Sequence, residues 1–165
     1  MKKNLLALML LATASSVSAV DLTSSLPVHR SEVKAGDRVL EFQGTPVSIN
    51  ALAPDFKVAD ASFKPVKLSD FLGKTVLISV VPSLDTGVCS IQTKKFNEQV
   101  TSLPENVVLL TISTDLPFAQ KRFCQKEQVD KLLVLSDAVW GDFGSNYGLR
   151  IKDMGILTRA VLIVD

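Results

Sequence analysis

The sequence is poor in the residue types that usually reveal a metal site or a nucleic-acid partner. It contains one histidine, His29, and two cysteines, so a four-ligand zinc site would also need carboxylates. We therefore predict no metal and no cofactor, and a surface position for His29. The formal net charge is +1, from 18 basic and 17 acidic residues, without a long run of either sign. This balance argues against nucleic acid as a partner.

Long apolar runs are also absent, apart from a short stretch near the N-terminus. Residues 5–12 are apolar and follow Lys2 and Lys3, and Val17-Ser18-Ala19 has the small-x-small pattern of a signal-peptidase site. A membrane-spanning helix needs about 20 apolar residues, and serines interrupt this stretch earlier. The sequence therefore predicts a secretory signal peptide over 1–19. We expect an exported protein, most simply periplasmic, with no membrane contact after cleavage.

The remainder suits one globular domain, since the chain has 165 residues and a hydrophobic content of 47%. Residues 20–38 are polar and poorly periodic, which predicts a flexible N-terminal arm. The folded domain is predicted over 39–165. At its start, short β-patterns at 39–42 and 46–49 flank Gly44, which predicts a hairpin with the glycine in the turn.

Strand-like and helix-like patterns then alternate along the chain. Strands are predicted at 57–59, 66–68, 75–81, 107–113, 132–135 and 159–165. Helices are predicted from Cys89 onwards, from Pro117 through Cys124 and over 138–147, with one helical turn at 69–73. This alternation predicts an α/β fold with a mixed sheet covered on both faces.

The segment Pro82-Ser-Leu-Asp-Thr-Gly-Val-Cys89 joins the buried strand at 75–81 to an amphipathic helix. Strand, turn and helix would place Cys89 in the first helical turn, where unpaired backbone N–H groups favour negative charge. A thiol there ionises more readily than a free thiol, and the thiolate is the nucleophile. Cys89 is therefore the candidate reactive residue.

The spacing of Pro82, Thr86 and Cys89 resembles the active-site loop of peroxiredoxins, in which three residues separate proline from threonine and two separate threonine from cysteine. A longer resemblance is to the bacterial thiol peroxidases, an atypical two-cysteine group. Residues 115–124 resemble their second-cysteine helix, 42–46 their opening hairpin, and Arg159-Ala-Val their arginine-bearing strand. The resemblance implies a thioredoxin-like fold, with a central mixed sheet flanked by helices and an added N-terminal β-hairpin.

The resemblance also implies a chemistry, the reduction of hydrogen peroxide or organic hydroperoxides in antioxidant defence. Cys89 would attack the peroxide as a thiolate and become a sulfenic acid. Cys124 would resolve it to an intramolecular disulfide, which a thioredoxin-like reductant would reduce. Thr86 would offer its hydroxyl to the sulfur or the peroxide, and Arg159 would stabilise the thiolate and hold the peroxide. Pro82 would shield the site from water.

Two other functions stay open at this point. An exported domain could carry a structural disulfide and no peroxidase activity. A thiol–disulfide oxidoreductase would share the fold, but such enzymes usually separate their cysteines by two residues. In either case Thr86 would act as a helix N-cap and Arg159 as a surface cation. Asp115 and Arg122 would cap and solubilise their helix.

Other residues are assigned structural roles. We expect Trp140, Phe143 and Tyr147 in the core, and Lys94 with Lys95 on a solvated helix face. The chain stops at Asp165, where the family continues with a further strand and helix, so we expect the domain to be C-terminally incomplete. Related enzymes are commonly homodimers, which leaves a homodimer open for this chain.

Overall fold

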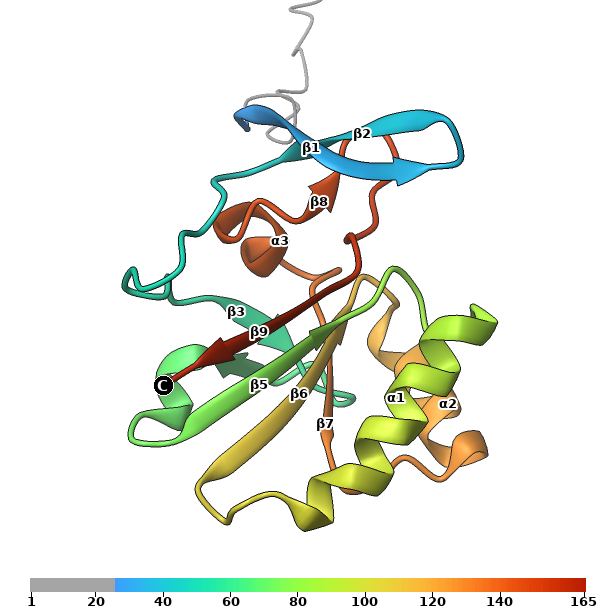
Figure 1. The fold of residues 1–165 in the computed structure, drawn as a ribbon. Helices are drawn as coiled ribbons and strands as arrows, with labels where there is room; N and C mark the ends of the chain where they lie inside the picture. Colours follow the sequence, from blue (N-terminus) through green and yellow to red (C-terminus); the bar gives the residue numbers. More distant parts are fainter. Residues whose placement is uncertain (1–25) are drawn as a thin grey trace, which may run out of the picture.

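Two β-sheets organise the part of the chain that the structure describes, residues 26–165 of a computed structural model (Figure 1). The larger sheet has the order β4-β3-β7-β6-β5-β9, and the smaller has the order β1-β2-β8. The larger sheet consists of β3 (Lys57–Ala59), β4 (Pro65–Lys67), β5 (Thr75–Val80), β6 (Val107–Ser113), β7 (Leu133–Ser136) and β9 (Ala160–Val164). The smaller consists of β1 (Val28–Ala35), β2 (Arg38–Gln43) and β8 (Arg150–Ile151). The predicted signal peptide over 1–19 lies outside the described residues.

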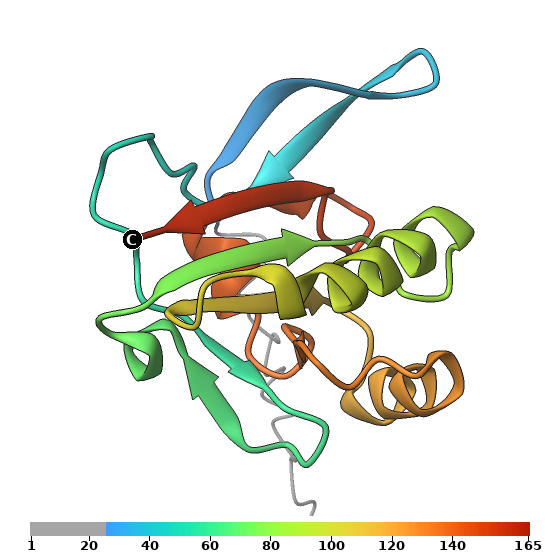
Figure 2. The ribbon, with the colours of Figure 1, turned by 60° about the horizontal axis from the view of Figure 1, so that its bottom comes forward.

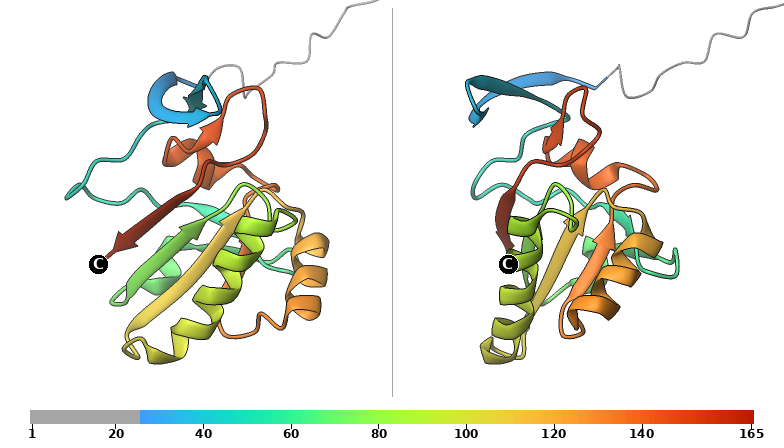
Figure 3. Two further views of the ribbon diagram at one scale, coloured as in Figure 1. Left: turned by 45° about the vertical axis from the view of Figure 1, so that its right-hand side comes forward. Right: turned by 90° about the vertical axis from the view of Figure 1, so that its right-hand side faces the viewer.

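Three α-helices and two 3-10 turns complete this part of the chain. They are α1 (Gly87–Gln99), α2 (Pro117–Glu127) and α3 (Asp142–Asn146), with η1 (Leu68–Phe71) and η2 (Val100–Ser102). Helices α1 and α2 lie side by side on one face of the larger sheet, and α3 lies on the other (Figure 3). Between residues 26 and 165, none of these helices has the length and apolar content needed to cross a membrane.

The central strands are buried on both faces because their side chains alternate between two cores. Val76, Ile78 and Val80 of β5 point to the α3 side, where they pack with Phe143 and Tyr147. Leu77 of β5 and Leu109 of β6 point to the opposite side, toward α1 and α2. There they pack with Phe96 and Val129. The predicted thioredoxin-like arrangement, a mixed sheet with helices on its faces, is confirmed.

β5 pairs with a strand on each side, and the two pairings run in opposite directions. β5 and β6 are parallel, with Val80 opposite Ile112. β5 and β9 are antiparallel, with Val80 opposite Ala160. Figure 2 shows β9 running against β5 and β6. The end of β5, the end of β6 and the start of β9 therefore meet at one edge of the sheet.

The N-terminal hairpin exists, but it is formed by earlier residues than predicted. β1 starts at Val28, inside the range predicted as a flexible arm, and pairs antiparallel with β2. Gly36, at φ +61°, and Asp37 form the two-residue turn between these strands. Glycine followed by aspartate suits such a turn because glycine adopts a positive φ without steric cost.

The predicted turn at Gly44 was wrong, since residues 46–49 form no strand. Gly44 has φ +112° and lies against the backbone of Ser145, where an added Cβ would collide with the carbonyl group. The Thr45 N–H donates to the Ser145 carbonyl oxygen at 2.9 Å. The glycine therefore allows a close approach between the hairpin and the α3 segment.

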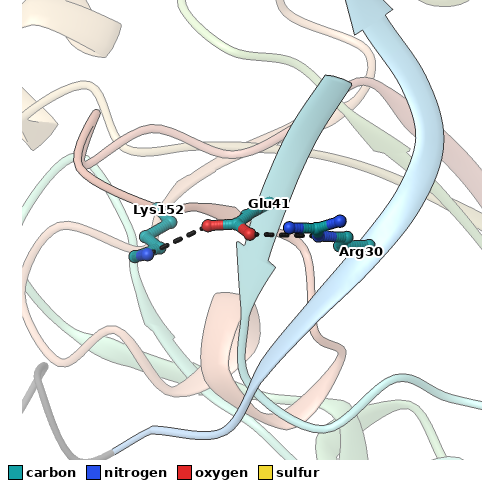
Figure 4. A network of polar contacts seen from close by, with 3 residues as sticks. All are labelled: Arg30, Glu41 and Lys152. Carbon is teal, nitrogen blue, oxygen red and sulfur yellow. Dashed lines mark hydrogen bonds and ion pairs between the residues drawn. The ribbon is translucent and has the colours of Figure 1, made fainter. Parts of the chain in front are cut away.

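The hairpin contacts the rest of the protein through a polar network and an aromatic contact. Glu41 accepts from Arg30 Nε at 3.3 Å and from Lys152 Nζ at 2.9 Å (Figure 4). These hydrogen bonds hold the pKa of the Glu41 carboxyl below its usual value. His29 is half-buried, lies edge-on to Phe42 and has its Nε2 3.0 Å from the Gly148 carbonyl oxygen. His29 is thus a packing residue of the hairpin.

The predicted helix over 138–147 is shorter than expected and begins at Asp142. Phe143 and Tyr147 lie in the core as predicted, but Trp140 is exposed, and its ring centroid lies 4.5 Å from Lys57 Nζ. The helix begins late because residues 138–140 form a turn and Gly141 adopts a left-handed conformation.

The buried carboxylate of Asp137 holds the start of α3. It accepts from the backbone N–H groups of Phe143 and Gly144, each at 2.9 Å. Burial raises the pKa of Asp137 from its usual 3.8 to about 6, although these hydrogen bonds and the charge of Arg150 act in the opposite direction. The carboxyl group therefore binds a proton more readily in the folded chain than in the unfolded chain.

This raised pKa predicts that the contribution of Asp137 to stability falls as the pH rises from about 4 to about 6. Below that window the group is protonated in both states, and above it the group is charged in both. In Asp137→Asn this titration is absent. The free energy of unfolding of the wild type minus that of the variant should therefore decrease by about 2 kcal/mol between pH 4 and pH 7. Urea unfolding at both pH values measures it, and a constant difference would contradict the assignment.

Candidate active site

The cysteine loop begins where the pairing of β5 with β6 ends. The Val81 N–H donates to the Ile112 carbonyl oxygen at 3.0 Å. The next residue, Pro82, has no N–H to continue the ladder, so the chain leaves the sheet. Thr86 is the N-cap residue of α1, and Cys89 follows in the first turn. The predicted order of strand, turn and helix around Cys89 is confirmed.

Cys89 is buried, at 1% exposure, in an apolar cluster with Val81 and Leu84. Arg159 Nη2 donates to the Cys89 Sγ at 3.1 Å. Arg159 directly precedes β9, and the pairing of Ala160 with Val80 brings the arginine to the end of β5. Arg159 is exposed whereas the sulfur is buried, so the contact joins a cation at the surface to a sulfur in an apolar cluster. A charge-assisted hydrogen bond of this kind stabilises negative charge on the acceptor.

Gln92 orients the guanidinium group of Arg159, a role that sequence reasoning missed. Its side-chain Oε1 accepts from Arg159 Nη1. Its Nε2 donates to the hydroxyl of Ser79, a buried residue of β5, at 2.9 Å. The sequence signal that could have identified Gln92 is its spacing, because a residue three positions after Cys89 lies on the same face of the helix.

Thr86 and Pro82 are both more exposed than Cys89. Thr86 is exposed, and its hydroxyl donates to the Ser83 carbonyl oxygen at 3.1 Å. Its side chain makes no N-cap hydrogen bond. The hydroxyl proton is therefore engaged, and the oxygen lone pairs remain available to accept from a substrate O–H. Pro82 is half-buried at the start of the loop.

Cys124 lies in the last turn of α2 and is half-buried. Burial raises the pKa of this thiol, so it remains protonated at neutral pH. Both cysteines are free, which does not agree with a permanent structural disulfide. Phe123 packs against the cluster around Cys89 and also against the cluster that contains Cys124.

Helices α1 and α2 are tied together at the end of α1 remote from Cys89. Lys94 Nζ lies 2.8 Å from the Glu127 carboxylate, and its side chain is 40% exposed. Lys95 is also exposed, so the predicted solvated face is confirmed, with an ion pair formed on it. Asn97 is buried; its Oδ1 accepts from the backbone N–H groups of Asp130 and Lys131 at 3.1 Å and 2.7 Å. These bonds fix α1 to the segment that follows α2.

Comparison with known proteins first identifies the class of protein to which the chain belongs. Residues 48–165 match the family model described as Redoxin. The crystal structure of a peroxiredoxin-like protein from Aquifex aeolicus has a TM-score of 0.75 to this structure at 35% sequence identity, and the match covers 83% of this chain and 81% of that chain. The chain therefore has the fold of a redoxin and belongs to this class.

Two curated relatives narrow this class. The thiol peroxidase of Oceanobacillus iheyensis is 50% identical over 122 residues, which cover 74% of each chain. The thiol peroxidase of Streptococcus agalactiae is 46% identical over 124 residues, which cover 75% of each. The chain therefore belongs to the thiol peroxidase family, and it is a thiol-dependent peroxidase.

Loss of the Arg159 cation should slow the reaction of Cys89 with peroxide. We expect Arg159→Met to lower the second-order rate constant by roughly 10- to 100-fold, because a hydrogen bond to a charged group contributes about 1.5–3 kcal/mol. Arg159→Lys should be intermediate, since an ammonium keeps the charge but not the planar fork. Stopped-flow mixing with hydrogen peroxide measures both.

Arg122→Met is the matched control for these variants. Arg122 is an exposed arginine on α2, so its replacement should leave the rate constant unchanged. Equal rates for Arg159→Met and the control would contradict a role for the Arg159–Cys89 contact.

Proposed function

We propose that this thiol peroxidase reduces hydrogen peroxide and organic hydroperoxides with Cys89 as the peroxidatic residue and Cys124 as the resolving residue. The observation that carries the proposal is the 3.1 Å contact between Arg159 Nη2 and Cys89 Sγ. It combines a permanent cation with a helix N-terminus, both of which stabilise negative charge on a nearby sulfur. The family of the chain supports peroxide as the substrate class.

In the first step, the thiolate sulfur of Cys89 attacks the terminal oxygen of the peroxide. An S–O bond forms as the O–O bond breaks, and the electron pair leaves with the second oxygen, which takes a proton to become water or an alcohol. Cys89 becomes a sulfenic acid and is oxidised by two electrons. Arg159 would hold the oxygen on which negative charge develops, and the Thr86 oxygen would accept from the peroxide O–H.

In the second step, Cys124 attacks the sulfenic acid sulfur, an S–S bond forms and water leaves. A disulfide requires the two Cα atoms to lie within about 7 Å. Because the cysteines occupy different helices, and because burial raises the pKa of Cys124, we expect the first turn of α1 and the last turn of α2 to open before this attack. A thioredoxin-like dithiol would then reduce the disulfide by thiol–disulfide exchange.

We also propose a biological role and a location for this activity. Removal of peroxides at the expense of a dithiol would be an antioxidant function. The segment 1–19 has the pattern of a secretory signal, so we propose that the enzyme acts outside the cytoplasm, most simply in a periplasm, with a reductant that is available there. A homodimer remains a prediction from the family resemblance.

The two cysteines should differ in their effect on the first oxidation. Cys89→Ser should abolish peroxide turnover and leave no rapid phase, because Cys124 is a protonated, half-buried thiol. Cys124→Ser should still react once and accumulate a sulfenic acid on Cys89. Stopped-flow kinetics with dimedone trapping and mass spectrometry separate these outcomes. Equal loss of the first oxidation in both variants would overturn the assigned roles.

Export can be tested on the whole chain. Expression in a bacterium with a periplasm should give a mature protein that starts at Val20 and is recovered in the periplasmic fraction. Intact-mass spectrometry of each fraction measures the cleavage. Ala19→Arg should block it, because a large charged residue does not fit the small-x-small site. A full-length mass in the cytoplasmic fraction for the wild type would contradict the proposal.

A further inference from the structure

The carboxylate of Asp115 is the centre of a hydrogen-bond cluster beside the cysteine loop. Its Oδ1 accepts from the Ser83 hydroxyl at 2.7 Å. Its Oδ2 accepts from the Leu84 backbone N–H at 2.8 Å and from the Ser113 hydroxyl at 2.7 Å. The expected capping role is wrong, because the N-cap residue of α2 is Leu116 and α2 has no side-chain cap. Asp115 therefore uses its carboxylate to hold a loop that is distant in sequence.

The two loop residues that Asp115 holds are those that shape the site. Leu84 is buried and packs against Cys89. Ser83 provides the carbonyl oxygen to which the Thr86 hydroxyl donates at 3.1 Å. The apolar wall of the cysteine and the orientation of the Thr86 hydroxyl thus both depend on bonds to one carboxylate.

Asp115 is itself fixed to the sheet. Its carbonyl oxygen accepts from the Ser136 hydroxyl at 2.7 Å, at the end of β7. Ser113, its partner at the end of β6, also accepts from Gln120 Nε2 at 3.0 Å. Gln120 lies on α2, is buried and donates to the Leu135 carbonyl oxygen at 2.9 Å. The loop is therefore anchored to two strands and to the helix that carries Cys124.

We propose that Asp115 is a positioning residue that holds the loop 82–86 in its peroxide-reactive conformation and opposes its rearrangement toward Cys124. This inference rests on the proposed two-cysteine function. The opening of the first turn of α1 begins next to Thr86, so bonds made only by the closed loop stabilise the closed state relative to the open one. Removal of these bonds should therefore have opposite effects on the two chemical steps.

Two substitutions at Asp115 distinguish the loss of its hydrogen bonds to the loop from the loss of its negative charge. Asp115→Ala removes all three acceptor interactions. Asp115→Asn keeps the shape, and its oxygen can still accept from Leu84 and Ser113 while its NH₂ group donates to the Ser83 hydroxyl, which can also act as an acceptor. Asp85→Ala is the matched control, since Asp85 is an exposed carboxylate in the same loop.

Quenched-flow mixing with hydrogen peroxide, followed by mass spectrometry, measures sulfenic acid formation and disulfide formation separately. We expect Asp115→Ala to slow sulfenic acid formation about 10-fold or more and to speed disulfide formation, because the closed loop loses three hydrogen bonds to a charged acceptor. Asp115→Asn should stay within about threefold of the wild type in both steps. Asp85→Ala should match the wild type. Slowing of both steps by Asp115→Ala would indicate a general structural defect and would overturn the inference.

Hydrogen exchange at the Leu84 amide tests the same inference without any catalysis, because this N–H donates directly to Asp115. In the reduced protein, Asp115→Ala should raise its exchange rate about 10-fold or more, and Asp115→Asn should leave it near that of the wild type. Unchanged exchange in Asp115→Ala would overturn the positioning role. A wild type that forms no sulfenic acid but shows this exchange pattern would contradict the proposed function and retain the positioning of the loop.

Discussion

The relative direction of three neighbouring strands is the constraint on which the site depends. β5 and β6 are parallel, so the segments that follow them, the cysteine loop and Asp115, leave the sheet at the same edge. β9 is antiparallel to β5, so the residue that precedes it, Arg159, enters at that edge too (Figure 2). α/β sheets place their sites where parallel strands end. Here the added antiparallel strand brings a cation to that position, and a cysteine, its cation and the anchor of its loop meet across large distances in sequence.

The two faces of the larger sheet are packed with different kinds of side chain. On the α3 side, Phe143 and Tyr147 pack against aliphatic strand residues. On the other side, the buried residues of α1 are Cys89, Thr93 and Asn97. The half-buried Phe96 also packs on this side against Leu109 and Val129, so α1 is held by partial apolar burial together with the hydrogen bonds of Asn97, and less firmly than a strand buried on both faces. Segments held in this way open at a lower free energy than a core strand, as the proposed disulfide step requires of the first turn of α1.

The local sequence pattern predicted the strands of the larger sheet, the helix that carries Cys89 and the motif of Pro82, Thr86 and Cys89. It did not predict the contacts between segments that are distant in sequence. The apolar run before Pro82 identified β5 because a strand buried on both faces has a near-continuous apolar sequence. Asp115 was misassigned because position alone suggested a helix cap, whereas its partners, Ser83 and Leu84, lie far away in sequence. The hairpin was predicted at the wrong residues because Gly44 allows the backbone to lie close to Ser145. The sequence alone does not distinguish a glycine needed for such a contact from a glycine needed for a turn.

The surroundings of the two cysteines impose an order on the proposed chemistry. Cys89 has a cation at hydrogen-bond distance and lies in the first turn of a helix, so it is prepared to react before anything moves. Cys124 lies in the last turn of α2, where partial burial raises the pKa of its thiol. A helix C-terminus carries partial negative charge, which further disfavours a thiolate. The resolving thiol becomes a good nucleophile only when its turn opens to solvent, so the conformational change that brings the sulfurs together is also the one that activates the second of them.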